Sequence, residues 1–213
     1  FGLLLVSLVS SAVAQTIFSM VDFGGNSHQA IIALMSAMVA IIVWGAAAWW
    51  FGIPTSQSHS LIAGLTGAAI AVQGGFDAIN GAEWIKVIYG ILLSTLMGFG
   101  LGWANFKVFG FFCRNLNRPR ANHFFRWAQI IAGAGVAFMH GAQDGQKFMG
   151  VMLLGICMVN GSSSTAGVRF PLWMLLLGSA AMALGTSIGG KKIIKSVGMD
   201  MVRLEKYQGF SAD

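Results

Sequence analysis

Long runs without a charged residue alternate with short charged segments along the whole chain. Six long runs contain no Asp, Glu, Lys or Arg, and they cover residues 1–21, 23–76, 87–106, 127–143, 148–168 and 170–190. A helix that crosses a membrane needs about 20 apolar residues. Three of the runs fit one crossing each, and the run 23–76 is long enough for two. The pattern therefore predicts an all-α fold of several membrane-spanning helices.

The longest run contains a natural break at Gly52-Ile53-Pro54. Proline disrupts a helix interior, and it also disfavours helical geometry in the residue before it. We therefore expect one full span at residues 29–51 and a shorter helix at residues 56–72.

Basic residues gather in two segments, 107–126 and 191–206, each at the end of an apolar run. Such clusters are typical of cytoplasmic loops. The chain accordingly divides into a helical part over 1–106, a basic cytoplasmic loop over 107–126, a second helical part over 127–190, and the start of a cytoplasmic segment over 191–213.

An even number of crossings must separate two segments on the same side, whereas three apolar runs lie between these two. The run after Phe148 turns into a Gly/Ser/Thr-rich loop at residues 160–167, so its helical part is too short for a full crossing. Joining 127–141 and 148–159 into one crossing restores an even count. We therefore predict one helix over 127–159 that is interrupted between His140 and Lys147.

Composition supports a membrane protein. Hydrophobic residues make up 56% of the 213 residues and charged residues only 9%, against about 25% charged in soluble domains. A soluble enzyme, a nucleic-acid-binding domain and a disordered tail are excluded, and the net charge of +6 reflects topology rather than a nucleic-acid partner. The two cysteines, Cys113 and Cys157, are expected to be reduced and packed.

The first polar stretch that lipid should not tolerate is Pro54-Thr55-Ser56-Gln57-Ser58-His59-Ser60. Thr55 or Ser56 can cap the following helix, whose first backbone N–H groups have no acceptor within the helix. Helix N-termini with nearby hydroxyls bind anions. An ordinary cap in a water-exposed loop is the alternative explanation.

The second polar stretch is His140-Gly141-Ala142-Gln143-Asp144-Gly145-Gln146-Lys147. A charged residue at membrane depth marks a candidate functional site. The alternative is that Asp144 and Lys147, which lie at i and i+3 on one helix face, only neutralise each other.

These two stretches resemble the signatures of the inorganic phosphate transporter (PiT) family. Residues 140–147 are similar to its G-A-N-D-x-x-N/Q motif, with Gln143 and Gln146 at the amide positions, and residues 54–59 are similar to its serine-rich Pro…His motif. The segment 185–195 is also family-like. Members carry each motif twice, in an inverted repeat with broken helices, so the resemblance implies that this chain is an interior part of a longer protein.

The leading hypothesis is a secondary transporter that carries inorganic phosphate with Na⁺ or H⁺ as coupling cation, in the plasma membrane. We assign phosphate binding to six residues: Thr55, Ser56, Gln57, Ser58, Gln143 and Gln146. Asp144 and Gln143 are assigned to the coupling cation, and His59, His140 and Lys147 to supporting roles. No cofactor and no resident metal are expected, the lipid bilayer is the surrounding medium, and a homo-oligomer is left open.

Three alternatives stay open at this stage. A carrier of sulfate or another oxyanion would use the same residue types. A membrane-embedded enzyme would use Asp144 with His140 or His59 as acid and base, although no metal-ligand or nucleophile motif accompanies them. A structural membrane subunit without transport would have no need for Asp144.

Overall fold

The computed structural model describes residues 2–9, 16–17, 19–24, 27–113, 118–160, 170–201 and 206–212. Their helices, in chain order, are α1 (Gly2–Val9), α3 (Ser27–Phe51), α4 (Gln57–Gln73), the 3₁₀ turn η1 (Phe76–Ala78), α5 (Gly81–Cys113), α6 (Arg118–Asn160), α7 (Leu172–Lys195), the π-helical turn η2 (Ser196–Met201) and α8 (Lys206–Ala212). Within these ranges the extended structure is limited to an isolated bridge between Val21 and Ile79. The all-helical prediction is confirmed.

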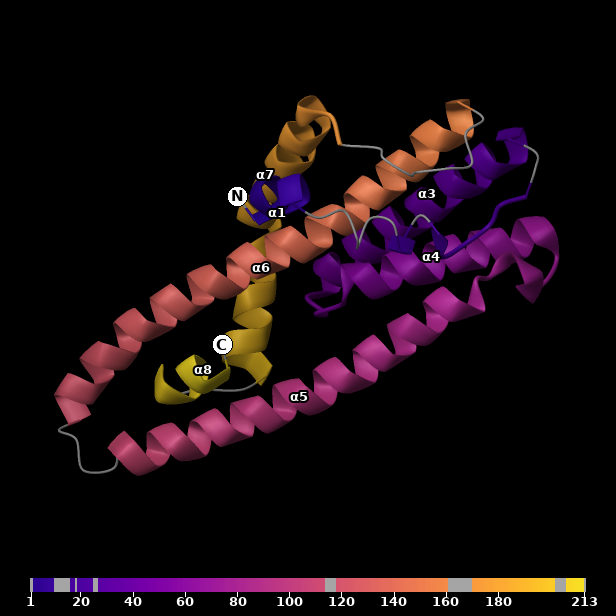
Figure 1. The fold of residues 1–213 in the computed structure, drawn as a ribbon. Coiled ribbons are helices and arrows are strands. Elements are labelled where there is room, and N and C mark those ends of the chain that lie inside the picture. Colours follow the sequence, from indigo (N-terminus) through magenta and orange to yellow (C-terminus); the bar gives the residue numbers. More distant parts are fainter. Residues whose placement is uncertain are drawn as a thin grey trace.

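Three of the described helical stretches are long and apolar enough to cross a membrane: α3, α5, and residues Leu172–Gly198, which contain α7. α5 has 33 residues, none of them buried, and in Figure 1 it extends along one side of the molecule. An apolar helix without buried residues is unfavourable in water but suits lipid. The chain is an integral membrane protein.

α3 and α4 form an antiparallel hairpin whose boundaries agree closely with the sequence. The predicted break at Gly52-Ile53-Pro54 is confirmed, since α3 ends at Phe51 and α4 begins at Gln57. Small buried residues on α3 face buried leucines on α4, and Ile41 packs directly over Gly64. Small residues let membrane helices approach closely, so this hairpin packs tightly enough to hold the start of α4 in place.

The predicted interruption between His140 and Lys147 is wrong. α6 is one continuous α-helix of 43 residues through this segment. The glycines at 141 and 145 permit unwinding but do not require it. The prediction that 127–159 forms a single element is nevertheless confirmed, because one helix covers all of it and α7 then returns in the opposite direction (Figure 1).

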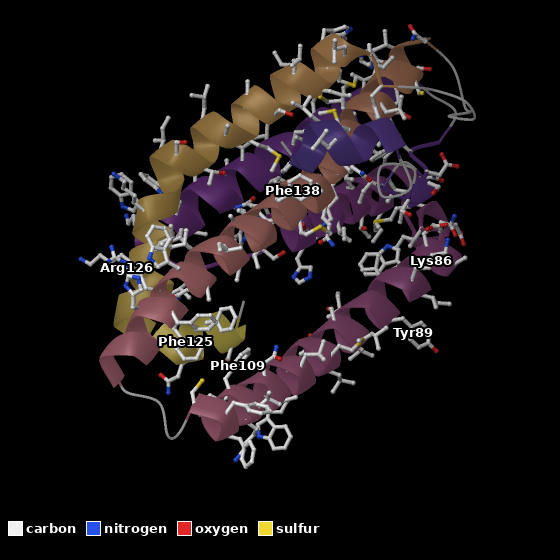
Figure 2. The ribbon with its side chains drawn as sticks, turned by 60° about the vertical axis from the view of Figure 1, so that its left-hand side comes forward. Lys86, Tyr89, Phe109, Phe125, Arg126 and Phe138 are labelled. Atoms are coloured by element: carbon white, nitrogen blue, oxygen red, sulfur yellow. The ribbon has the colours of Figure 1, made fainter. Side chains whose placement is uncertain are left out.

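The two basic segments lie at the same end of the molecule. The rings of Phe109 on α5, Phe125 on α6 and Phe210 on α8 contact one another, with centroid distances of 5.0 to 6.0 Å. Figure 2 shows Phe109 and Phe125 at this end, far from Lys86. α6 and α7 run in opposite directions between these segments (Figure 1), and the even number of crossings stays a prediction. The segment 107–126 is not a long loop, however, because α5 continues to Cys113 and α6 begins at Arg118.

The C-terminal half of α6 lies between two hydrophobic clusters. On one side Val151 and Leu154 pack into the cluster of α3 and α4. On the other side Met149 packs with Leu3 of α1 and with Met174 and Leu175 of α7. α6 is therefore fixed on both sides immediately after the polar segment 140–147.

The ends of α3 and α7 are joined by polar contacts. Lys192 donates a hydrogen bond to the carbonyl of Trp50 at 2.6 Å, and Ser196 donates one to the carbonyl of Gly52 at 2.7 Å. The indole of Trp49 donates to the carbonyl of Gly189 at 3.1 Å. The last carbonyls of a helix lack helical partners. Lys192 and Ser196 supply hydrogen-bond donors to the carbonyls of Trp50 and Gly52 at the end of α3.

Close packing of α1 against α6 generates a first prediction. A Cβ atom added at Gly145 would lie 2.7 Å from Leu3 Cδ1 and 2.8 Å from Leu3 Cβ, whereas one added at Gly133 would meet nothing within 4 Å. We expect Gly145→Ala to destabilise the protein by about 1–3 kcal/mol through overpacking. Gly133→Ala, on the same helix, should be neutral or stabilise by up to about 1 kcal/mol through helix propensity.

The measurement is the thermal unfolding midpoint of both variants in the same detergent. An unchanged midpoint for Gly145→Ala would show that α1 does not hold this position against α6.

Candidate functional site

Ser56 caps α4, as the sequence indicates. Its backbone is extended, and its side-chain oxygen accepts a hydrogen bond from the His59 backbone N–H at 3.3 Å. Ser60 Oγ donates to the Ser56 carbonyl at 3.0 Å. These bonds fix the first turn of α4, so the next hydroxyl, that of Ser58, has a defined direction.

Ser58 points at the acidic residue of α6. Its hydroxyl donates a hydrogen bond to Asp144 Oδ1 at 3.0 Å, and it accepts one from the Lys147 ammonium at 2.7 Å. Lys147 also donates to the same Asp144 oxygen at 2.7 Å. Three polar groups from two helices thus form a closed triangle, which we call the Ser58–Asp144–Lys147 triad. The two polar stretches, which we assign to one binding site from the sequence, therefore meet in the structure.

The charged members of the triad are largely shielded. The side chain of Asp144 is 18% exposed and that of Lys147 is 23% exposed. The pair at i and i+3, considered in the sequence analysis as the alternative, is therefore present in the structure. It is not isolated, however, because Ser58 from α4 bonds to both charges.

His140 lies on the other side of the carboxylate. Its Nε2 is 3.4 Å from Asp144 Oδ2, and its side chain is 70% exposed. His140 and Gln143 together line an open groove of about 480 Å³ along α6. The carboxylate therefore has Oδ1 held by the triad and Oδ2 near the exposed His140.

The remaining predicted residues are not in the triad. Gln57 turns back over α3, where its amide lies close enough to Gly45 that a Cβ there would be 2.9 Å from Nε2. Gln146 is 2% exposed and faces the interior, whereas His59 is exposed at the start of α4. Thr55 is half-buried in the connection between α3 and α4.

Sequence reasoning missed the rest of the groove. Besides His140 and Gln143 it is lined by four residues without charge: Ala132, Gly135, Val136 and Met139. Their spacing of three and four residues is the only signal that places them on one face of a helix. Nothing in their chemistry distinguishes them from ordinary membrane-facing positions.

The arrangement brings together groups whose chemistry suits charged ligands of either sign. The carboxylate of Asp144 and the hydroxyl of Ser58 are oxygen ligands of the kind that hard cations take. The Lys147 ammonium and the start of α4 favour anions. Among the described residues no group of three His, Cys, Asp or Glu side chains is placed to hold a metal ion.

Comparisons with known proteins agree on one family. The model of the "Phosphate transporter family" matches residues 1–121 and residues 112–213. A protein of Bacillus subtilis (strain 168) named "Probable low-affinity inorganic phosphate transporter" is 34% identical over 97% of this chain and 61% of its own length. A protein of the same name from Mycobacterium bovis is 33% identical over 99% of this chain and 50% of its own length.

A more distant relative is the "Low-affinity inorganic phosphate transporter PitB" of Escherichia coli (strain K12), 30% identical over 72% of this chain and 36% of its own length. The chain thus spans between a third and three fifths of the length of these relatives. No solved structure matches it.

The triad predicts a short distance between α4 and α6. In a background with Cys113 and Cys157 replaced by Ala, the pair Ser58→Cys and Asp144→Cys should cross-link rapidly with a short bifunctional thiol reagent. The control pair, Gln57→Cys with Asp144→Cys, should cross-link much more slowly because Gln57 turns toward α3.

The measurement is the rate of cross-linking in membranes, read by mass spectrometry of the linked peptides. Equal rates for the two pairs, with all thiols demonstrably reactive, would contradict the placement of Ser58.

Proposed function

Because the chain belongs to the phosphate transporter family, we propose that it acts in the secondary transport of inorganic phosphate together with a cation, Na⁺ or H⁺. The observation that carries this proposal is the contact of the capped start of α4 with Asp144, in a protein in which only 9% of the residues are charged. A charged side chain within a membrane helix carries a considerable energetic cost. A role in binding ions would account for a charged residue at this depth.

The anion subsite in this proposal is the start of α4 with Ser56, Ser58 and Lys147. The first N–H groups of a helix attract negative charge, and hydroxyl and ammonium groups add hydrogen-bond donors to phosphate oxygens. Thr55, Gln57 and Gln143 lie close by in the chain and are proposed to join when phosphate is bound.

The cation subsite in this proposal is the Asp144 carboxylate. Phosphate carries at least one negative charge at neutral pH, and two like charges about 4 Å apart repel by roughly 4 kcal/mol at an effective dielectric constant of 20. That corresponds to nearly a thousandfold loss of affinity. A cation at Asp144 removes the repulsion, so each ligand raises the affinity of the other, which is the thermodynamic basis of symport.

Two other functions remain distinguishable by experiment. An oxyanion carrier of broader specificity would transport sulfate equally well, so excess sulfate would compete with labelled phosphate for uptake. A structural subunit would show no uptake at all. The enzyme alternative is set aside, because the matched family is one of transporters.

The proposal predicts a specific effect of Asp144→Asn. The amide keeps the size and the hydrogen bond to Ser58 but loses the charge, so phosphate no longer needs a cation. The cation-induced gain in phosphate affinity, expected at about 10- to 100-fold for coupled ligands, should fall to about 1. Accumulation of phosphate against its gradient should be lost while expression and folding are retained.

The measurement is phosphate uptake by proteoliposomes of the whole protein under imposed Na⁺ or proton gradients. Glu83→Gln is the matched control, because Glu83 forms a 2.7 Å pair with Lys86 at the same i, i+3 spacing on another helix, α5. Unchanged cation dependence in Asp144→Asn would place the coupling elsewhere.

A further inference from the structure

The Lys147 ammonium occupies the position that a cation bound to Asp144 would take. It lies 2.7 Å from Asp144 Oδ1 and 2.7 Å from Ser58 Oγ. Both contacts are with oxygen atoms, which are also the ligands of hard cations in proteins. A free cation that binds between Asp144 Oδ1 and Ser58 Oγ must displace the ammonium from both, whereas Asp144 Oδ2 faces His140 instead.

We propose that Lys147 is a tethered competitor of the coupling cation: it neutralises Asp144 when no cation is bound, and it must leave Asp144 Oδ1 before the cation can bind between this oxygen and Ser58. This inference rests on the proposed function and assigns a role within the same site. Lys147 is a flexible four-carbon chain with three donors, so an ammonium displaced from Asp144 can turn toward an anion at the start of α4 while staying in reach of Ser58.

Charge balance explains why such a competitor couples the binding of phosphate to the binding of the cation. In the conformation described, Asp144 and Lys147 sum to zero. Phosphate alone adds negative charge and draws the ammonium away, which exposes the carboxylate to a cation. A cation alone must displace the ammonium without any compensation for it, so cation binding is weak until phosphate is present. The lysine thereby discourages transport of the cation by itself.

The geometry separates this role from simple stabilisation. The other described lysine–carboxylate pair at i, i+3 is Lys86–Glu83, also at 2.7 Å, but Lys86 is 65% exposed and its hydrogen bond is to Glu83. Lys147 instead bonds to a residue of a second helix as well as to its own. The pair Lys86–Glu83 therefore supplies a control that matches spacing and distance but lacks the contact between helices.

The test measures two affinities that should change in opposite directions in Lys147→Met. Phosphate binding in a Na⁺-free choline medium should weaken by about tenfold or more, because Asp144 is left uncompensated. Na⁺ binding in the absence of phosphate should tighten by a similar factor, because its competitor is gone. Lys86→Met should change neither value, and Lys147→Arg, which keeps the charge, should stay closer to the wild type.

The assay is isothermal titration calorimetry of the detergent-solubilised whole protein with inorganic phosphate and with NaCl. If Na⁺ produces no heat with the wild type in the presence of phosphate, proton uptake followed with a pH-sensitive dye replaces the NaCl titration. A loss of both affinities in Lys147→Met would show a merely structural role, and no change in either would show that Lys147 does not compete; both outcomes overturn the inference. Absence of phosphate binding by the wild type would instead reject the proposed function, while the cation titration would still test the competition at Asp144.

Discussion

The polar centre of this protein depends on how one carboxylate is compensated inside an apolar helix bundle. Asp144 lies well within α6, where an uncompensated charge is several kcal/mol unfavourable. The side chains of Lys147 and Ser58 bond to the same oxygen, and only one of them comes from α6 itself. The start of α4 is therefore needed next to the middle of α6. The tight α3–α4 hairpin and the two clusters on either side of α6 serve to hold it there.

This compensation also explains why α6 is continuous where the sequence suggested a break. Unwound backbone in a membrane helix is tolerated where carbonyl and N–H groups line a polar cavity. In the conformation described, side chains meet the polar needs of Asp144, so the backbone can keep its own hydrogen bonds. The number of crossings was a correct signal for one helix, but it does not report whether side chains or backbone satisfy the charge. The breaks at Gly52-Ile53-Pro54, by contrast, are dictated locally by proline and were predictable.

Side-chain directions set the limit of prediction at the site. The sequence analysis assigned Ser58 and Asp144 to one ion-binding site because both belong to polar stretches that are unfavourable in lipid. It grouped Gln57 and Gln146 with them for the same reason, yet one amide lies over Gly45 and the other is buried on a different face of α6. The direction of Gln57 depends on the space beside Gly45 of α3, which has no side chain. The direction of Gln146 depends on the rotation of α6 about its axis. Neither quantity is encoded in the polarity of the two stretches.

Because α6 is long, a small tilt of this helix at the triad corresponds to a large displacement at the basic end of the molecule. At 1.5 Å per residue, the helix between Asp144 and Arg118 is about 39 Å long. Because α6 has no break along this stretch, a tilt of about 10° around Asp144 would carry Arg118 roughly 7 Å sideways, by the same helix geometry. The ring contacts of Phe109, Phe125 and Phe210 lie along that arm. A tilt of α6 about Asp144 would therefore displace this aromatic contact by several ångströms, because the rings lie far along a rigid helix from the triad.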